Sequence, residues 1–297
     1  MKVGVMLPVG GSDGPDGRMP AWADVRRIAE SAEEAGLDSV WLADHFFYRA
    51  PDGTTYGMHE AWTLLSAVAA VTERVELGTM VLCASFRDPG LVANMAATID
   101  EVSDGRLILG VGAGWHDPEY EANGLPTDHR VGRFAEWLEI VARLVRGETV
   151  TFDGKYHQVH EAALEPPAPR RIPILVAARQ PRMLDLTARW ADSWNTAWFG
   201  AVDDRVKSRL REFQSALATA GRPENEVTKT VGLSVRDPDQ PAVPEPDDHA
   251  FAGTVEDLAT LFKDYESLGV EHLIVGMEPM SPRSVERLAE AKRLAND

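Results

Sequence analysis

Residues 75–112 read VELGTMVLCASFRDPGLVANMAATIDEVSDGRLILGVG, and this stretch decides the predicted fold. It begins with an apolar run at 75–82 and ends with another at 106–112, and each run is typical of a strand. Residues 88–105 lie between them and have the amphipathic pattern of a helix. A strand, a helix and a second strand in this order predict a parallel pair joined by a right-handed crossover.

The same alternation extends towards both ends of the chain. Further strand candidates lie at 2–7, 38–43, 172–178, 192–198, 230–235 and 271–277. Amphipathic stretches such as 21–36, 134–147 and 253–269 predict helices between them, the last with Thr254 as its N-cap. Most of the strand candidates are almost entirely apolar, which suits strands covered on both faces. Eight such units predict an α/β fold, a (β/α)8 barrel, and an open doubly wound sheet is the alternative.

Two segments depart from this rhythm within what we predict to be one domain, residues 1–297. Residues 149–171 predict an inserted β-hairpin with its turn at 153–155, followed by a proline-rich return. Residues 236–250 contain four prolines and five acidic residues with almost nothing to bury. They predict a mobile loop after the seventh strand.

The formal net charge of −17 argues against binding to nucleic acid or to an anionic membrane surface. An anionic small molecule remains possible, because screening acts over roughly 8 Å and nearby arginines can outweigh distant carboxylates. No apolar run approaches the roughly 18 residues of a membrane span, and the N-terminal stretch is too short for a signal peptide. Cys83, the single cysteine, lies in an apolar run and is expected to be buried. We expect a cytoplasmic protein.

The carboxyl ends of the strands carry the candidate site, because the active site of such a barrel forms there. Polar and aromatic residues follow four of the strands: Asp44 and His45; Trp115, His116, Asp117 and Glu119; Arg179 and Arg182; Asn195 and Thr196. An imidazole exchanges protons near neutral pH, and an adjacent carboxylate can orient it. Asp44 and His45 are therefore candidates for acid–base chemistry, with a buried structural pair as the alternative.

Several other chemistries find no support. The sequence has no His-x-His, no His-Glu-x-x-His and no cysteine pair, so no metal site is predicted. It has no lysine at the carboxyl end of a predicted strand for an imine. The glycines of 110–115 lack the third glycine of a dinucleotide fingerprint, and they suit either a tight turn or the close approach of a flat ligand. The helix start near Pro181, beside Arg179 or Arg182, suits a phosphate.

In order and spacing, four segments resemble the luciferase-like flavin and deazaflavin oxidoreductases: 36–46, 75–124, 173–195 and 253–275. The resemblance implies a barrel with an insertion that binds the deazaflavin coenzyme F420 or FMN, and a homodimer. In the deazaflavin branch an Asp-His pair lies against the cofactor ring, which matches Asp44 and His45. The resemblance implies that Asp44 holds polar groups of the cofactor and that His45 transfers a proton or contacts the substrate.

The resemblance assigns roles to three further segments. The Met80–Val81 bond matches a cis peptide behind the cofactor ring. Gly112 belongs to the segment under the cofactor, while Trp115, with His116 beside it, faces the substrate.

The loop at 177–179 matches the phosphate site of the family. Relatives carry two glycines where this chain has Ala177 and Ala178. The added methyl groups restrict the backbone, so we expect the phosphate to be held differently, more by Arg179.

The sequence thus predicts an F420-dependent oxidoreductase that transfers a hydride between the cofactor and a small organic substrate. One alternative is an FMNH2-dependent monooxygenase supplied by a separate cofactor-reducing enzyme. Others are a non-catalytic flavin-binding barrel and a phosphate-binding barrel with lyase or isomerase chemistry. The lysines that sugar-phosphate-oxidising relatives use are not found, which disfavours that substrate. Met6, Trp62, Trp115, Trp198 and Phe199 hint at an apolar pocket, although each could equally belong to the core.

Overall fold

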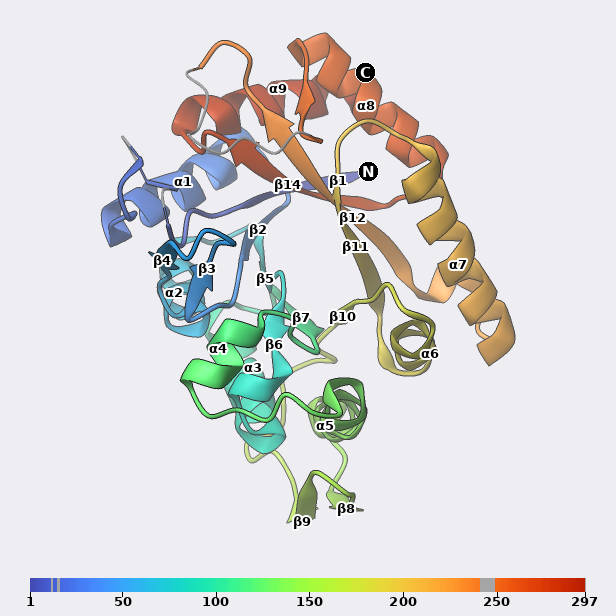
Figure 1. The fold of residues 1–297 in the computed structure, drawn as a ribbon. Coiled ribbons are helices and arrows are strands. Elements are labelled where there is room, and N and C mark those ends of the chain that lie inside the picture. Colours follow the sequence, from blue (N-terminus) through green and yellow to red (C-terminus); the bar gives the residue numbers. More distant parts are fainter. Residues whose placement is uncertain (12, 15–16, 241–248, 297) are drawn as a thin grey trace.

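The structure, a computed structural model, describes residues 1–11, 13–14, 17–240 and 249–296. Its central feature is a closed ring of parallel strands with helices on the outside (Figure 1). The ring strands are β1 (Lys2–Met6), β2 (Ser39–Leu42), β5 (Glu76–Thr79), β7 (Leu107–Gly112), β10 (Ile174–Ala177), β11 (Ser193–Phe199), β12 (Thr228–Arg236) and β14 (His272–Glu278). Strand β10 pairs with β7 as well as with β11, which closes the ring. The predicted barrel is confirmed, and the open sheet is excluded.

Helices follow the strands and cover the ring. They are α1 (Trp22–Ala35), α2 (Ala61–Val71), α3 (Pro89–Val102), α4 (Asp117–Ala122), α5 (Arg130–Val145), α6 (Pro181–Trp190), α7 (Asp204–Ala220), α8 (Val255–Ser267) and α9 (Pro282–Asn296), with 3-10 turns at Ala84–Phe86 and Glu224–Glu226. Thr254 caps α8 as predicted, because its hydroxyl accepts from the Asp257 amide. Within the part of the chain that the structure describes, no helix has the length and hydropathy of a membrane span.

The third ring strand differs from the sequence prediction. Residues 75–82 read as one strand, but β5 ends at Thr79 and the chain resumes pairing as β6 (Leu82–Cys83) against the far end of β7. The Met80–Val81 bond between them is cis, as the resemblance implies. The break places this peptide at the carboxyl end of the ring.

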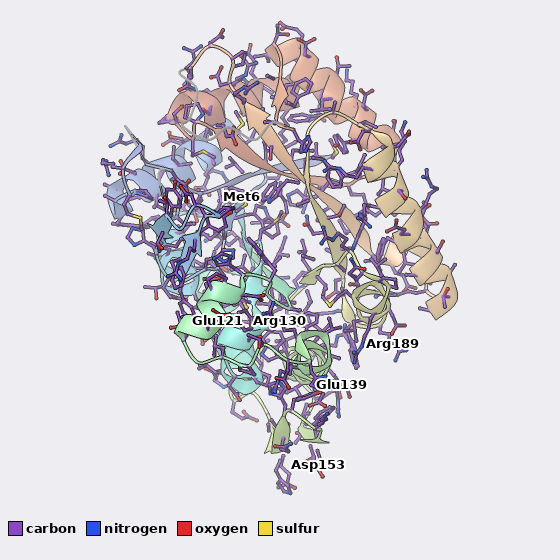
Figure 2. All side chains as sticks on the ribbon, viewed as in Figure 1. Met6, Glu121, Arg130, Glu139, Asp153 and Arg189 are labelled. Atoms are coloured by element: carbon purple, nitrogen blue, oxygen red, sulfur yellow. The ribbon has the colours of Figure 1, made fainter. Side chains whose placement is uncertain are left out.

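Two hairpins extend from the barrel. One, formed by β3 (Phe47–Arg49) and β4 (Thr55–Gly57), follows β2 and was not predicted. The other, formed by β8 (Val150–Asp153) and β9 (Gln158–Ala162), lies in the predicted insertion, and its connection spans 154–157. It projects away from the ring, with Asp153 at its outer end (Figures 1 and 2).

The predicted mobile loop at 236–250 falls partly outside the described residues, which exclude 241–248. Strand β12 continues through Arg236, and the short strand β13 (Phe251–Ala252) pairs with its end. The neighbouring turn is held by Asp237, whose carboxylate accepts from the Gln240 side chain at 2.7 Å.

The barrel has two apolar layers. The larger lies between the strands and the helices, while a small inner cluster contains Trp41, Met80, Leu175 and Ile274. Trp41 faces the interior because side chains alternate along a strand. A Cβ at Gly78, its register partner on β5, would lie 2.2 Å from the Trp41 ring. Glycine on the neighbouring strand therefore makes room for the indole.

A histidine is buried among these inner residues. His272 is 3% exposed and shares a 2.7 Å hydrogen bond with the Ser39 hydroxyl. Trp41 Nε1 donates to the same hydroxyl at 2.7 Å. Burial lowers the pKa of His272 to about 3, so the ring is neutral in the folded protein at ordinary pH.

We expect the free energy of unfolding to fall as the pH drops below about 6.5, where an unfolded histidine takes up its proton. The folded state keeps His272 neutral down to about pH 3, so acid favours the unfolded chain between these two values. The loss from this residue is about 1.4 kcal/mol per pH unit. Urea unfolding at several pH values measures it, and His272→Gln should have a correspondingly shallower pH dependence. The control, His160→Gln at an exposed position, should leave the pH dependence of the free energy of unfolding unchanged. An equal pH dependence in wild type and His272→Gln would contradict the prediction.

Candidate functional site

A cavity of 280 Å³, here called the mouth cavity, lies at the carboxyl ends of the ring strands. Its walls come from the ends of β2, β5, β7, β10 and β11 and from the residues that follow them. Six of the ten residues to which the resemblance assigns a role line it: Asp44, His45, Met80, Val81, Trp115 and Ala177. Ring closure therefore gathers residues from five strands around one cavity.

Four residues to which the resemblance assigns a role lie outside the lining of the mouth cavity: Gly112, His116, Ala178 and Arg179. His116 is 6% exposed, and its Nε2 accepts from the Arg49 amide at 3.0 Å, which ties α4 to the β3–β4 hairpin. Ala178 is buried, and its amide donates to the Asn195 carbonyl at 3.1 Å. Arg179 is exposed at the surface. Their assigned contacts with substrate or cofactor stay predictions.

The glycines of 110–115 make room for the protein's own atoms. A Cβ at Gly112, which also lies outside the lining, would come 2.7 Å from Val81 Cγ2. Gly114 lines the cavity with a φ of +77°, and a Cβ there would lie 1.9 Å from the Tyr120 hydroxyl. Internal packing therefore requires glycine at both positions, whether or not a ligand approaches.

His45 is held by a buried carboxylate that the sequence did not assign a role. Its Nδ1 lies 2.8 Å from Oε2 of Glu119, a residue that is 1% exposed. The other Glu119 oxygen accepts from the amides of Phe46 and Phe47. A carboxylate can only accept, so Nδ1 carries the hydrogen and Nε2 is the ring nitrogen that this contact leaves free. Among the described residues, none forms a hydrogen bond with Nε2.

The Asp44 carboxylate is already occupied by three donors. Arg87 donates to both oxygens, at 2.7 and 2.9 Å, and the Cys83 amide donates at 2.8 Å. Arg87 also contacts Glu60. Such a bidentate pair is rigid and strong. Asp44 lines the cavity but is 4% exposed, so its contact with polar groups of a cofactor stays a prediction.

Cys83 is buried, as the sequence predicts. Its sulfur lies 3.3 Å from the Tyr120 hydroxyl, which donates to the Ala113 carbonyl at 3.0 Å. Burial raises the pKa of the Cys83 thiol to about 11. The thiol is therefore protonated at neutral pH and is not a nucleophile.

A second hollow, here called the arginine crevice, has a volume of 420 Å³. It is lined by Asp117, Thr127, His129, Arg130, Val131, Gly132 and Arg182. Arg130, labelled in Figure 2, pairs with Asp117 and lies over the Tyr120 ring at 4.2 Å. Arg182 is exposed and has no ion pair within the described part of the chain. The segment 114–120 borders both hollows, which places this cationic surface beside the mouth cavity.

Several residues in or next to the mouth cavity were not predicted from the sequence or were left without a role. Glu119 was noted at the end of strand four, but its partner His45 lies 74 residues away. Arg87 directly precedes the α3 N-cap Asp88, and nothing in the local sequence links it to Asp44. Trp198 lines the cavity and is 40% exposed, so it belongs to the pocket and not to the core.

Comparison with known proteins gives a family match and clear relatives. The model of the luciferase-like monooxygenase family matches residues 1–243. An F420-dependent glucose-6-phosphate dehydrogenase of Kineococcus radiotolerans is 33% identical over 219 residues, which are 72% of this chain and 64% of that protein. A phthiodiolone/phenolphthiodiolone dimycocerosates ketoreductase of Mycobacterium tuberculosis is 31% identical over 231 residues, 71% of this chain and 60% of that protein. The chain thus spans less than two thirds of the length of these relatives.

Two solved structures have the same fold. An F420-dependent secondary alcohol dehydrogenase in complex with an F420–acetone adduct superposes with a TM-score of 0.83 at 20% identity, covering 100% of this chain and 99% of that one. The coenzyme F420-dependent tetrahydromethanopterin reductase from Methanopyrus kandleri gives 0.78 at 17% identity, covering 97% of each chain. At these identities the likeness supports the barrel alone. The family match and the relatives together show that the chain belongs to the luciferase-like monooxygenase family.

Proposed function

We propose that this protein is an F420-dependent oxidoreductase that transfers a hydride between the deazaflavin and a small organic substrate. The observation that carries the proposal is His45, which lines the mouth cavity with Nδ1 fixed by Glu119. The names of relatives support the cofactor, because those at 33 and 34% identity are F420-dependent dehydrogenases.

The mouth cavity fits a flat cofactor ring. Small residues such as Gly114, Ala177 and Ala197 line it beside the Met80–Val81 peptide, so little side-chain volume fills the space between the strand ends. When bound, the deazaflavin supplies the hydride or accepts it. The protein supplies the walls of the cavity and the proton. We propose that Asp44, which lines the cavity, contacts polar groups of the cofactor and that Gly112 lies under its ring.

His45 is proposed to manage the proton that accompanies the hydride. When an alcohol is oxidised, its carbon loses a hydride and its oxygen loses a proton, which the neutral imidazole accepts at Nε2. In the reverse direction the same nitrogen donates the proton to the carbonyl oxygen. Glu119 keeps Nδ1 protonated in both directions and so fixes which nitrogen reacts.

Arginines beside the cavity are proposed to hold the phosphate-bearing tail of the cofactor. Arg179 and Arg182 flank the start of α6, are exposed, and form no ion pair within the described residues. The free amides of that helix start add to the attraction. The Ala178 amide is used by the Asn195 carbonyl, which supports the prediction that Arg179 contributes more here than the loop backbone.

Titration of the full chain with three ligands tests the proposal: F420, the same chromophore without its phosphate-bearing tail, and FMN. We expect F420 to bind more tightly than either of the others. Arg179→Ala combined with Arg182→Ala should weaken the binding of F420 by about tenfold, which is about 1.4 kcal/mol. The affinity for the chromophore without the tail should stay unchanged. Arg189→Ala is the matched control, because Arg189 lies in the last turn of the same helix (Figure 2).

The same titration decides among the alternatives. Tight FMN binding without F420 affinity, together with oxygen consumption when reduced FMN is supplied, would replace the proposal by an FMNH2-dependent monooxygenase. Binding of F420 without hydride transfer to any substrate would favour a non-catalytic flavin-binding barrel. No affinity for either cofactor would favour a phosphate-binding lyase or isomerase.

A homodimer, a cytoplasmic location and a single domain over residues 1–297 also belong to the proposal. A separate cofactor-reducing enzyme is a further proposed partner, and the monooxygenase alternative requires one. The proposal also includes contacts of Trp115 and His116 with the substrate. Trp115 lines the mouth cavity, which supports its contact. Family membership supports the other parts of the proposal. Size-exclusion chromatography with light scattering tests the homodimer.

A further inference from the structure

We propose that the substrate is an uncharged, largely apolar ketone or secondary alcohol whose ring or alkyl body lies against Trp115 and Trp198. The inference rests on the proposed hydride-transfer function and names the substrate class of that site. Two features of the mouth cavity lead to it, an exposed aromatic wall and a lining without cations.

Large aromatic side chains are exposed at the mouth cavity. Trp115 is 63% exposed and Trp198 is 40% exposed, and both line the cavity. Phe86, a third lining aromatic residue, stacks on Phe46 with 4.2 Å between ring centroids. Covering apolar surface favours binding, so an apolar ligand gains affinity by burying these rings. Clustered exposed apolar surface of this kind is typical of a binding site.

The aromatic wall begins at the proton-exchanging residue. The Trp115 ring lies edge-on to His45, with 5.7 Å between centroids. Tyr48 of the β3–β4 hairpin continues the wall, 6.3 Å from Trp115 and stacked on His116 at 5.1 Å. A substrate oxygen next to His45 therefore places the rest of the molecule against Trp115.

The lining of the mouth cavity offers nothing to an anion. Of the described residues that line it, none is a lysine or an arginine, and two, Asp44 and Glu119, are carboxylates. The residues outside the described ranges, 12, 15–16, 241–248 and 297, contain no lysine or arginine in the sequence. A phosphate or carboxylate on the substrate would lose its hydration without gaining a partner. A neutral carbonyl needs only the proton donor.

Besides Arg130 and Arg182 of the arginine crevice, Arg236 is a further cation that the test must address. It ends β12 at the same end of the barrel, is partly buried, and has no ion pair or hydrogen bond from its side chain within the described residues. It does not line the mouth cavity. An anionic substrate that reached Arg236 would contradict the inferred substrate class.

The proposed step balances without any further reagent. In the reductive direction the carbonyl carbon takes a hydride, two electrons and one proton, from the reduced deazaflavin. The π bond of the carbonyl breaks, its oxygen takes a proton from His45, and His45 recovers that proton from solvent. The products are a secondary alcohol and the oxidised cofactor, and alcohol oxidation reverses every step.

Two ketones that differ in one substituent, a neutral methyl group or an anionic carboxylate, test the proposal. The F420-loaded full chain is titrated calorimetrically with 4-methylcyclohexanone and with 4-oxocyclohexanecarboxylate, and kcat/KM is measured for each with reduced F420. We expect the methyl compound to bind at least about tenfold more tightly and to react with the higher kcat/KM. Equal or tighter binding of the carboxylate would overturn the proposal. A chain that does not bind F420 at all would instead overturn the proposed function.

Variants locate the binding surface. Trp115→Ala and Trp198→Ala should each weaken the binding of 4-methylcyclohexanone by about tenfold and leave the Kd of F420 unchanged. Trp22→Ala is the matched control, because Trp22 is 37% exposed on α1 and does not line the cavity. Arg236→Met should leave the preference between the two ketones unaltered. If Arg236→Met instead abolished tight binding of the carboxylate, the site would be an anion site and the inference would be wrong.

Discussion

Replacing His45 by alanine is expected to lower kcat by about 10²- to 10⁴-fold, the range for loss of a general acid–base. The folded state should survive, because the His45 side chain is 21% exposed at the edge of the mouth cavity. The loss of its hydrogen bond to the buried Glu119 carboxylate should lower the free energy of unfolding by about 1.5–3 kcal/mol, the range for a hydrogen bond to a charged group. Stopped-flow oxidation of reduced F420 by the most reactive ketone measures the first quantity, and urea unfolding measures the second.

The control for this prediction is His160→Ala, which removes a histidine that is 83% exposed on β9, away from the barrel. Its kcat should equal that of wild type. Unchanged turnover in His45→Ala, with cofactor binding intact, would show that the imidazole takes no part in the reaction.

Glu119→Gln tests how His45 is positioned. The introduced amide can donate to Nδ1, so the neutral imidazole would carry its hydrogen on Nε2 and could not accept a proton there. We therefore expect slower alcohol oxidation and an altered pH profile of kcat, with an unchanged Kd for F420. A purely structural role for Glu119 would lower stability without changing the shape of the pH profile.

Replacing Asp44 by alanine is expected to lower the free energy of unfolding by about 3–5 kcal/mol, the cost of breaking a buried ion pair. The Arg87 side chain is 10% exposed, so the variant would leave a mostly buried guanidinium with Glu60 as its remaining acidic partner. The Cys83 amide would also lose its acceptor. Urea unfolding at neutral pH measures the change.

Two comparisons sharpen this prediction. Asp44→Asn combined with Arg87→Met removes both charges and should recover part of the lost stability, because no unpaired charge remains buried. Glu30→Ala breaks the exposed Arg26–Glu30 pair on α1 and should cost no more than about 0.5 kcal/mol. If Asp44→Ala kept full stability and weakened only F420 binding, Asp44 would act mainly on the cofactor, as the family resemblance implies.

The barrel could be predicted from the sequence because its strands are buried on both faces. Such a strand must be apolar along its whole length, and a helix covering it must be amphipathic, so both patterns can be recognised within a few residues. The strand predicted at 271–277 is β14 (His272–Glu278), and that predicted at 106–112 is β7 (Leu107–Gly112). The break after Thr79 escaped prediction, since an apolar run looks the same whether pairing continues or shifts to another part of β7.

The sequence by itself determined the order of strands and helices and the position of Asp44 and His45 at the end of a strand. Only the tertiary structure decided their partners, because these contacts join residues far apart in the chain. His45 meets Glu119 across 74 residues, and Asp44 meets Arg87 across 43. Hydrophobic periodicity depends on neighbouring residues, whereas these pairs exist only because the closed ring brings the ends of β2, β5 and β7 together. Local chemistry thus marked where the candidate site lies, and ring closure determined how its side chains are held.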